Sequence, residues 1–426
     1  MKWNAKVKVL FGVSGLLVTP SLSLGLPLAR ANTVHITFWE SYVADDQVPL
    51  HHLIAQFNRT HPGIVVKTQY VPSGTGEQKL VAAVASGTAP DVAWIQGDLQ
   101  PLVQGHAIYN LSKWYHQIPQ ATRARIYPSL VENAKWQGKL FSVPIEATDL
   151  GIVYNVQLFQ QAHLALPTKQ WTWQQFASDV KRLSDPAKKQ YGFMVPDLVG
   201  SLAGYESWIF QPFMWDAGGR YAGPKGKPIT YNDAGAVKAL EFWHSLVTKD
   251  GAILSSAASS NAFQTGKLAM YIDGPWDIPS FAKLPFKWGV AWLPKGPKVQ
   301  TTNVGGEYLA VFRQSKHPMQ AWDFVKWWMA PAQETKWAVS SGYLPITSGV
   351  SQVPAWKSYA KTNQGASAFA SELKMGYTEP GIVDQNQTDA NLATAIQEVL
   401  LGKASAKAAL SQAVKTSNQE IASGGA

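Results

Sequence analysis

The stretch AFQTGKLAMYIDGPWDIPSF, residues 262–281, decides the expected fold. It predicts the end of a helix, a short buried strand at Leu268–Ile272, and a turn at Asp273–Pro275, because Gly and Pro both interrupt regular structure. Trp276 therefore follows a strand directly. Its ring can fill the core beside the turn, or it can offer a flat apolar face to a ligand that has one too, such as a pyranose.

Strands and helices alternate on the N-terminal side of this stretch, which predicts an α/β fold. Val34–Trp39 alternates as a strand, Val48–Thr60 has apolar residues at helical spacing, and Ile64–Tyr70 is the next strand. A second unit follows, with a helix over Glu77–Ser86 and a strand over Asp91–Ile95. Later helices are expected at Asp233–Thr248, Met319–Met329, Ala332–Ser340, Gln387–Leu400 and Ser405–Ile421.

Acidic residues follow two of these strands. Glu40 ends the first strand, and Asp98 closes the strand of the second unit. In open parallel sheets, ligands bind beyond the carboxyl ends of the strands, so both acids are candidate ligand contacts. Exposed loop acids or helix caps remain the alternative.

The chain passes from one strand to another without a helix near its middle. Leu140–Pro144 is a strand, Ile145–Asp149 follows, and Gly151–Tyr154 is an apolar strand. Such a passage is typical of a chain that crosses between domains. The length of 426 residues also suggests two or three domain-sized units.

The N-terminus resembles a signal peptide. Lys2, Lys6 and Lys8 precede the apolar run Val9–Leu28, and Ala29–Ala31 has the small-residue pattern of a cleavage site. An N-terminal anchor helix is the alternative, but several Gly and Pro residues interrupt the run. We therefore expect residues 1–31 to be removed on export.

Composition excludes several classes of protein. Cleavage would remove Lys2, Lys6, Lys8 and Arg30 and no acid, which would lower the net charge from +9 to +5. The sequence has no dense run of basic residues of the kind that would suggest nucleic-acid binding. Cysteine is absent, which excludes disulfides, thiol catalysis, cysteine metal sites and a lipoprotein anchor. The histidines form no zinc motif. A charged fraction of 15% suggests an acidic habitat, where few carboxylates would be lost to protonation.

Several segments together resemble the extracellular solute-binding proteins of carbohydrate ABC importers, of the maltose- and trehalose-binding kind. They are ITFWES (36–41), SGTAPDVAWIQGD (86–98), GKLFSVPIEATDLGIVYN (138–155), FQTGKLAMYIDGPW (263–276), VGGEYLAV (304–311) and SSGYLPIT (340–347). The resemblance covers essentially the whole mature chain. It implies a type II periplasmic-binding-protein fold, with two α/β lobes, a multi-segment hinge, and a ligand in the cleft on which the lobes close.

The resemblance also implies where the lobes divide. The N-terminal lobe would comprise residues 32–147 and 308–343, and the C-terminal lobe residues 148–307 and 344–426. The crossings would lie near Glu146–Leu150, Gly306–Ala310 and Tyr343–Ile346.

Site residues follow from the same resemblance, position by position. Carboxylates would bind sugar hydroxyls, tryptophans would stack on the ring, and the remaining residues would face the ligand from the crossings. The set is Glu40, Asp98, Glu146, Trp208, Trp276, Gly305, Gly306, Glu307 and Tyr343. Tyr343 could instead simply pack beneath the hinge.

The expected function is therefore extracytoplasmic binding of a neutral sugar, a di- or oligosaccharide, and its delivery to the permease of an ABC importer. We expect a monomer without catalytic activity, cofactor or metal, free in the periplasm or outside the cell.

Two alternatives stay open. A glycerol-3-phosphate or phosphodiester binder of the same family would use a late arginine, but Met375–Gln387 has no Arg or Lys, and only Lys374 lies beside it. A buried dianion without a cation is costly. An exported glycoside hydrolase would use two of Glu40, Asp98, Glu146 and Glu307 as acid and nucleophile. Such an enzyme would not need the matched crossing segments.

We predict that export leaves a protein that begins at Asn32, because Ala29–Ala31 is the small-residue site that follows the apolar run. Mass spectrometry of the exported protein measures this directly. An intact N-terminus in the membrane fraction would contradict the prediction.

Overall fold

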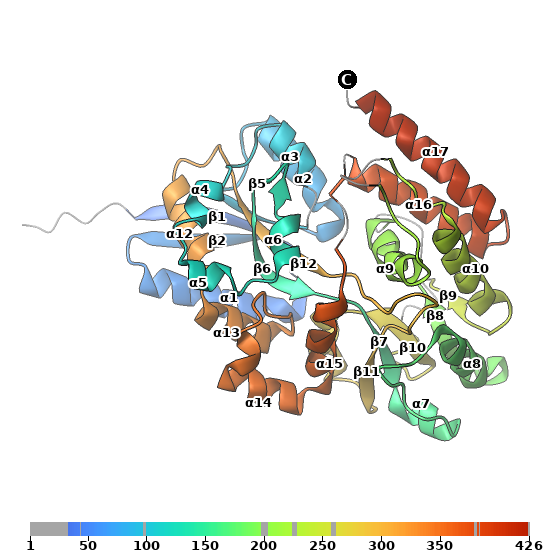
Figure 1. Cartoon of the computed structure of the whole chain (residues 1–426). Coiled ribbons are helices and arrows are strands. Elements are labelled where there is room, and N and C mark those ends of the chain that lie inside the picture. Colours follow the sequence, from blue (N-terminus) through green and yellow to red (C-terminus); the bar gives the residue numbers. More distant parts are fainter. Residues whose placement is uncertain are drawn as a thin grey trace, which may run out of the picture.

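The computed structural model describes residues 33–42, 44–96, 99–196, 203–223, 228–256, 261–378, 381–382 and 384–424. Two lobes, each built around one five-stranded sheet, lie side by side (Figure 1). The expected α/β class with two sheet-containing lobes is confirmed. Among the helices of these ranges, none is both long enough and apolar enough to cross a membrane.

The first lobe contains a sheet with the strand order β2-β1-β3-β12-β6. β1 is parallel to β2 and β3, whereas β12 is antiparallel to both β3 and β6. The strands are β1 (Val34–Glu40), β2 (Ile64–Tyr70), β3 (Val92–Ile95), β6 (Val143–Thr148) and β12 (Gly305–Val311). A small hairpin, β4 (Lys135–Trp136) with β5 (Lys139–Leu140), precedes β6.

The second lobe contains a sheet with the order β11-β7-β10-β8-β9. β7 is antiparallel to β10 and β11, and β8 is parallel to β10 and β9. The strands are β7 (Gly151–Asn155), β8 (Tyr191–Val195), β9 (Ile253–Leu254), β10 (Leu268–Asp273) and β11 (Trp288–Trp292). The central strand β10 is the buried strand of the stretch 262–281.

Helices cover both sheets. Those before β6 are α1 (Ala44–Thr60), α2 (Ser73–Ala85), α3 (Gln100–Gln104), α4 (Ser112–Tyr115), α5 (Gln120–Arg123) and α6 (Pro128–Asn133). Those between β7 and β12 are α7 (Val156–Gln161), α8 (Trp173–Leu183), α9 (Ala203–Asp216), α10 (Ala234–Thr248) and α11 (Ile278–Phe281). After β12 come α12 (Pro318–Trp328), α13 (Pro331–Ser341), α14 (Pro354–Thr362), α15 (Gln364–Glu372), α16 (Gln385–Leu400) and α17 (Ala406–Gly424). Single 3-10 turns are η1 (Pro186–Lys188), η3 (Pro275–Asp277), η4 (Val350–Gln352) and η5 (Leu373–Met375).

Two local expectations need correction. The first helix begins at Ala44 rather than Val48, with Asp45 and Asp46 in its first turn, where acidic side chains favour the helix N-terminus. Residues 261–266 form turns rather than the end of a helix. Gly266 adopts φ +70°, a conformation that ends regular helix before β10.

The C-terminal part of the chain packs on both lobes. α13 and α14 are neighbours, α15 packs on β11, and α16 packs on both α9 and α17. In Figure 1 the helices α13 and α14 lie below the first lobe and α15 lies beside the second sheet, whereas α16 and α17 lie over the second lobe.

Three segments run together where the lobes meet. Asp149 and Leu150 connect β6 to β7, and residues 293–304 connect β11 back to β12. The Thr302 hydroxyl accepts from the Leu150 N–H at 3.0 Å and donates to its carbonyl at 2.9 Å. Tyr377 follows α15 and exchanges backbone hydrogen bonds with Thr302 and Val304.

The observed crossings between the lobes differ in part from the expected ones. The first passage lies where the sequence predicts it, but the second precedes β12, since Glu307 to Ala310 are already paired in the first sheet. Leu344 pairs with Ala147, so the segment around it lies against the first crossing. The boundaries of the two lobes stay a prediction.

Carboxyl groups are buried at this junction. Both carboxyl oxygens of Asp149 lack a hydrogen-bond partner, and one oxygen of Glu372 accepts from the Leu293 N–H at 3.0 Å while the other has none. Burial, and then the nearby Asp149 carboxyl, raises the pKa of Glu372. Burial also raises the pKa of Asp216 to about 9, although hydrogen bonds from the backbone of Thr301 and Gly296 lower it. The junction therefore favours protonated carboxyls.

We predict that Glu372→Gln stabilises the protein at alkaline pH. Because the folded-state pKa of Glu372 is raised, the folded protein retains a proton that the unfolded chain has lost, and stability falls with rising pH by up to about 1.4 kcal/mol per pH unit. Gln cannot ionise. Urea unfolding at about pH 4 should therefore show little difference, and at about pH 8 the variant should be more stable.

The matched control is Glu241→Gln, on an exposed position of α10, which should change stability by less than about 0.5 kcal/mol at either pH. Equal stability of wild type and Glu372→Gln at the higher pH would contradict the prediction.

Candidate functional site

Two predicted carboxyls lie opposite each other in the first sheet. Glu307 of β12 is in register with Glu146 of β6, and their side chains are 7% and 0% exposed. Burial, and then the Glu307 carboxyl, raises the pKa of Glu146. Burial raises the pKa of Glu307 to about 8, although a hydrogen bond from Gln96 at 3.4 Å opposes the shift. This pair therefore retains protons more readily than ordinary carboxyls do.

Aromatic side chains surround Glu146. The Tyr42 hydroxyl and the Trp337 indole N–H both donate to its Oε2 oxygen, the former at 3.3 Å. Tyr343 stacks on Trp337 with 6.2 Å between ring centroids and meets Tyr42 edge-on at 6.0 Å. The predicted Tyr343 thus lies beside the carboxyl pair, although its own ring is buried.

Asp46 adds a third carboxyl to this group. It lies in the first turn of α1, is fully buried, and has no hydrogen-bond partner at either oxygen. Burial raises the pKa of Asp46 to about 8, and the Asp45 and Asp277 carboxyls add to the shift. We call Asp46, Glu146 and Glu307 the carboxyl cluster.

Glu40 occupies the end of β1, as predicted. Its Oε2 oxygen accepts from the Tyr42 backbone N–H at 3.0 Å and from the Gln47 amide at 3.1 Å. Burial raises the pKa of Glu40 in spite of these hydrogen bonds. The side chain therefore holds the turn between β1 and α1, next to the carboxyl cluster.

The two predicted tryptophans come together from different elements of the second lobe. Trp208 of α9 and Trp276 of η3 have their ring centroids 6.2 Å apart, and Tyr205 contacts both. We call these three rings the aromatic group. Trp276 and Trp208 are each partly exposed. Their faces are thus available for contacts beyond the core.

Glycines make room for these rings. A Cβ atom built on Gly274 would lie 2.1 Å from the Trp276 ring, and one on Gly305 would lie 3.1 Å from the Trp208 ring. A Cβ on Gly306 would lie 2.6 Å from the Glu146 carbonyl oxygen. Gly305 and Gly306 therefore allow β12 to approach both Trp208 and β6, which joins the aromatic group to the carboxyl cluster.

A second carboxyl pair lies beside the aromatic group. Asp273 ends β10, and its carboxyl shares a hydrogen bond with that of Asp277 in η3. Burial, and then Asp277, raises the pKa of Asp273. None of Glu40, Asp46, Glu146, Asp273, Asp277 and Glu307 forms an ion pair with a lysine, arginine or histidine that the structure describes.

The structure thus brings eight of the nine predicted residues into two adjoining groups. Glu40, Glu146, Glu307 and Tyr343 gather in the first sheet and its helices, with Gly305 and Gly306 linking them to Trp208 and Trp276. Asp98 lies outside the described residues. Whether these side chains contact a ligand stays a prediction.

Sequence reasoning missed several neighbours. Tyr42 and Asp46 both follow Glu40 closely in the chain, and this position after a strand end was a usable signal. Trp337 is 191 residues from Glu146 and has the pattern of a core residue, so the sequence alone gave no sign of it. Among the described residues, no group of His, Asp and Glu is arranged to hold a metal ion.

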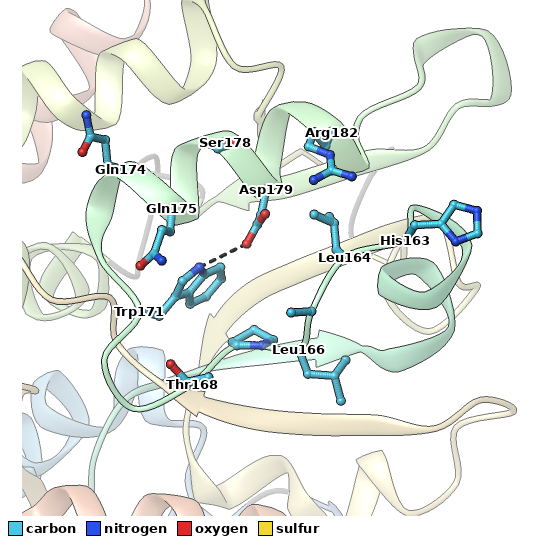
Figure 2. A pocket seen from close by; sticks show the side chains of 12 residues that line it. His163, Leu164, Leu166, Thr168, Trp171, Gln174, Gln175, Ser178, Asp179 and Arg182 are labelled. Carbon is cyan, nitrogen blue, oxygen red and sulfur yellow. Dashed lines mark hydrogen bonds between the residues drawn. The ribbon is translucent and has the colours of Figure 1, made fainter.

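A separate cavity of about 470 Å³ lies between the α7–α8 connection and α8 (Figure 2). The Trp171 indole N–H donates to Asp179 at 3.1 Å, and Arg182 donates to the Ala162 carbonyl at 3.1 Å. Its lining includes none of the described residues predicted for the site. Because Trp171, Asp179 and Arg182 already have hydrogen-bond partners in the protein, we regard this cavity as a surface hollow.

Comparison with known proteins identifies the family. A family model described as bacterial extracellular solute-binding protein matches residues 52–364. A galactooligosaccharide-binding protein of Bacillus subtilis is 23% identical over 389 residues, which cover 86% of this chain and 85% of that protein.

Solved structures show the same fold. An ABC substrate-binding protein of Listeria monocytogenes in complex with cycloalternan superposes with a TM-score of 0.82 at 20% identity, over 92% of this chain and 100% of that one. UgpB of Mycobacterium tuberculosis in complex with glycerophosphocholine gives a TM-score of 0.79 at 20% identity, over 91% and 98%.

Proposed function

Because this chain belongs to the family of bacterial extracellular solute-binding proteins, we propose that it binds a neutral sugar, a di- or oligosaccharide, for delivery to an ABC importer. The sugar would lie between the two lobes, against the carboxyl cluster and the aromatic group. The name of the relative from Bacillus subtilis and the cycloalternan complex both support a saccharide.

The observation that carries this proposal is the meeting of partly exposed rings with unpaired carboxyl oxygens. Trp208 and Trp276 are partly exposed, and one oxygen each of Glu146 and Glu307 is buried without a partner. Sugars need both kinds of contact, because the C–H face of a pyranose stacks on an aromatic ring while its hydroxyls pair with carboxyl and amide groups. Gly305 places the two kinds of group side by side.

The rest of the proposal concerns location and partners. The protein would act outside the cytoplasm as a monomer, after cleavage of residues 1–31 and without a lipid anchor. Its protein partner would be the transmembrane permease of an ABC importer, as the name of the Listeria relative suggests. It would bind without catalysis, in line with the binding proteins it resembles.

The second candidate ligand is a glycerophosphodiester, which the complex of UgpB with glycerophosphocholine favours. A phosphate needs a cationic or N–H-rich partner. Lys374, beside the region where such a cation is expected, is exposed on η5, and the site carboxyls form no ion pair with a described cation. Since no described ion pair brings a cation to these carboxyls, a phosphate would lack the partner that it needs, and the neutral sugar is preferred.

A thermal-shift screen tests the proposal. The panel would contain mono-, di- and trisaccharides, glycerol-3-phosphate and glycerophosphocholine. A ligand at 100 times its dissociation constant adds about 2.7 kcal/mol to stability, which raises the melting temperature measurably. We expect a neutral saccharide to give the largest shift. A shift with glycerophosphocholine alone would support the second candidate, and release of free sugar products would indicate a hydrolase.

We predict that Trp276→Ala weakens sugar binding by about 1–3 kcal/mol, the loss expected for one ring contact. The turn does not depend on the indole, because Gly274 and Pro275 fix the backbone. Calorimetric titration beside a urea melt separates binding from folding. A loss of about 3–5 kcal/mol in stability with unchanged affinity would place Trp276 in the core instead.

The matched control is Trp114→Ala. Trp114 in α4 is also partly buried and contacts two rings, Tyr109 and Trp322, in the first lobe. The Trp114→Ala variant should have a lower free energy of unfolding and an unchanged affinity for the sugar.

A further inference from the structure

We propose that Asn303 is a positioning residue for the Trp208 ring: its side chain ties the turn of α9 that carries Trp208 to the segment that crosses between the lobes. The inference rests on the proposed function, in which Trp208 stacks on the sugar, and adds a residue that sets the place of that ring. Asn303 is fully buried and lies two residues before β12. It acts through Trp208 rather than by touching the ligand.

The first observation is a proline inside α9. In an α-helix the carbonyl of each residue accepts from the N–H four residues later, so the regular donor to the Trp208 carbonyl belongs to position 212. That residue is Pro212, which has no N–H. The helix therefore leaves the Trp208 carbonyl without its regular donor. Because unpaired backbone groups are costly to bury, this carbonyl needs a donor from elsewhere in the chain.

Asn303 supplies such a donor. Its Nδ2 group donates to the Trp208 carbonyl at 3.1 Å and lies 3.5 Å from Oε1 of Gln211, which is also in α9. Residues 208 and 303 are 95 positions apart, so this bond joins two distant parts of the chain. A regular helix would already use the Trp208 carbonyl, and Pro212 is what makes it available to the crossing segment.

The second observation is that the crossing segment contacts Trp208 at two places. Asn303 holds its carbonyl, and Gly305 lies beside its ring, where a Cβ atom would be 3.1 Å from the indole. Val304 separates these two residues, and its N–H donates to the Tyr377 carbonyl at 2.7 Å. The backbone and the ring of Trp208 are thus placed by one short stretch, residues 303–305, which is itself held by a neighbouring segment.

The strand β12 carries this placement into the first lobe. It begins at Gly305 and pairs with β6, which sets Glu307 opposite Glu146. Because Asn303 and Glu307 belong to one continuous segment, a few residues of backbone place the Trp208 ring relative to the carboxyl cluster. The bond from Asn303 therefore fixes Trp208 with respect to both lobes.

α9 also has an attachment within its own lobe. The hydroxyl of Ser207, the residue directly before Trp208, donates to Asp389 of α16 at 2.6 Å, and the Tyr221 hydroxyl donates to the same oxygen at 2.6 Å. These bonds hold α9 on α16. The bond from Asn303 is different, because it attaches α9 to the segment that leaves the lobe.

The other end of the Asn303 amide argues against a purely structural role. Its Oδ1 oxygen is buried and has no hydrogen-bond partner among the described residues, which is costly. An apolar side chain of similar size would avoid this cost, but it would leave the Trp208 carbonyl without the donor. The amide is therefore suited to holding Trp208 rather than to stability alone.

Titration calorimetry tests the inference with the saccharide that gives the largest thermal shift in the panel above. The proteins are the wild type, Asn303→Ala, Trp208→Ala and the double variant. We expect Asn303→Ala to weaken binding by about three- to tenfold, a usual size for a residue that acts through a neighbour. In the Trp208→Ala background the same substitution should change affinity by less than about twofold, because the ring that it positions is gone.

Pro212→Ala provides a second background, which also serves if Asn303→Ala alone does not fold. Alanine at this position restores the helix N–H, so the Trp208 carbonyl keeps a donor when Asn303 is truncated. In a urea melt, Asn303→Ala should therefore cost less stability in this background than in the wild type. It should still weaken binding by a similar factor, because the tie to the crossing segment is lost in both backgrounds.

The matched control is Asn155→Ala. Asn155 is also a buried asparagine of the second lobe, and its Oδ1 accepts from the N–H groups of Gln157 and Leu158 at the start of α7. This variant should have a lower free energy of unfolding and an unchanged affinity for the sugar.

Unchanged affinity in a folded Asn303→Ala, or in Asn303→Ala combined with Pro212→Ala, would overturn this inference and leave sugar binding intact. An equal loss of affinity with and without the Trp208 ring would overturn it as well, because Asn303 would then act independently of the ring. If Trp208→Ala binds the sugar as tightly as the wild type, the inference fails while sugar binding stands. If no saccharide binds to the wild type, the proposed function fails, and this inference fails with it.

Discussion

The return of the chain from the second sheet into the first is the contact on which the site depends. β12 inserts between β3 and β6, and this antiparallel pairing sets Glu307 opposite Glu146. The same strand begins with two glycines, so it can run close to β6 and beneath Trp208. A slip of one residue would turn Glu307 to the other face of the sheet. Register therefore determines the chemistry of the site.

The buried carboxyls of this arrangement carry an electrostatic cost in folding free energy. Buried carboxyls without cations lie both in the carboxyl cluster and at the junction of the lobes, where Asp149 and Glu372 are fully buried. Such groups destabilise a protein when they ionise and cost less when they are protonated. At the junction the consequence is a stability that falls with rising pH.

The aromatic group shows how a binding surface can form from distant parts of the chain. Trp208 comes from α9, a helix without a distinct apolar face, and Trp276 comes from the turn after β10. Gly274 allows the Trp276 ring to lie against its own turn, so the indole is held without filling the core. Under the proposed function, a sugar would stack on a ring that needs little further ordering, which would keep the entropic cost of binding small.

The residue pattern by itself determined the α/β class, the strand before Trp276 and the place of Glu40 at a strand end, because local periodicity and turn chemistry depend on neighbouring residues. The two-lobed fold was implied by the resemblance of several sequence segments to a known family. The sequence could not determine that Trp337 donates to Glu146 across 191 positions, or that Asp46 joins the carboxyl cluster. It also placed the second crossing inside β12. Only tertiary structure decides such features, since strand register, burial and the pKa shifts that follow from them depend on residues that meet solely in the folded chain.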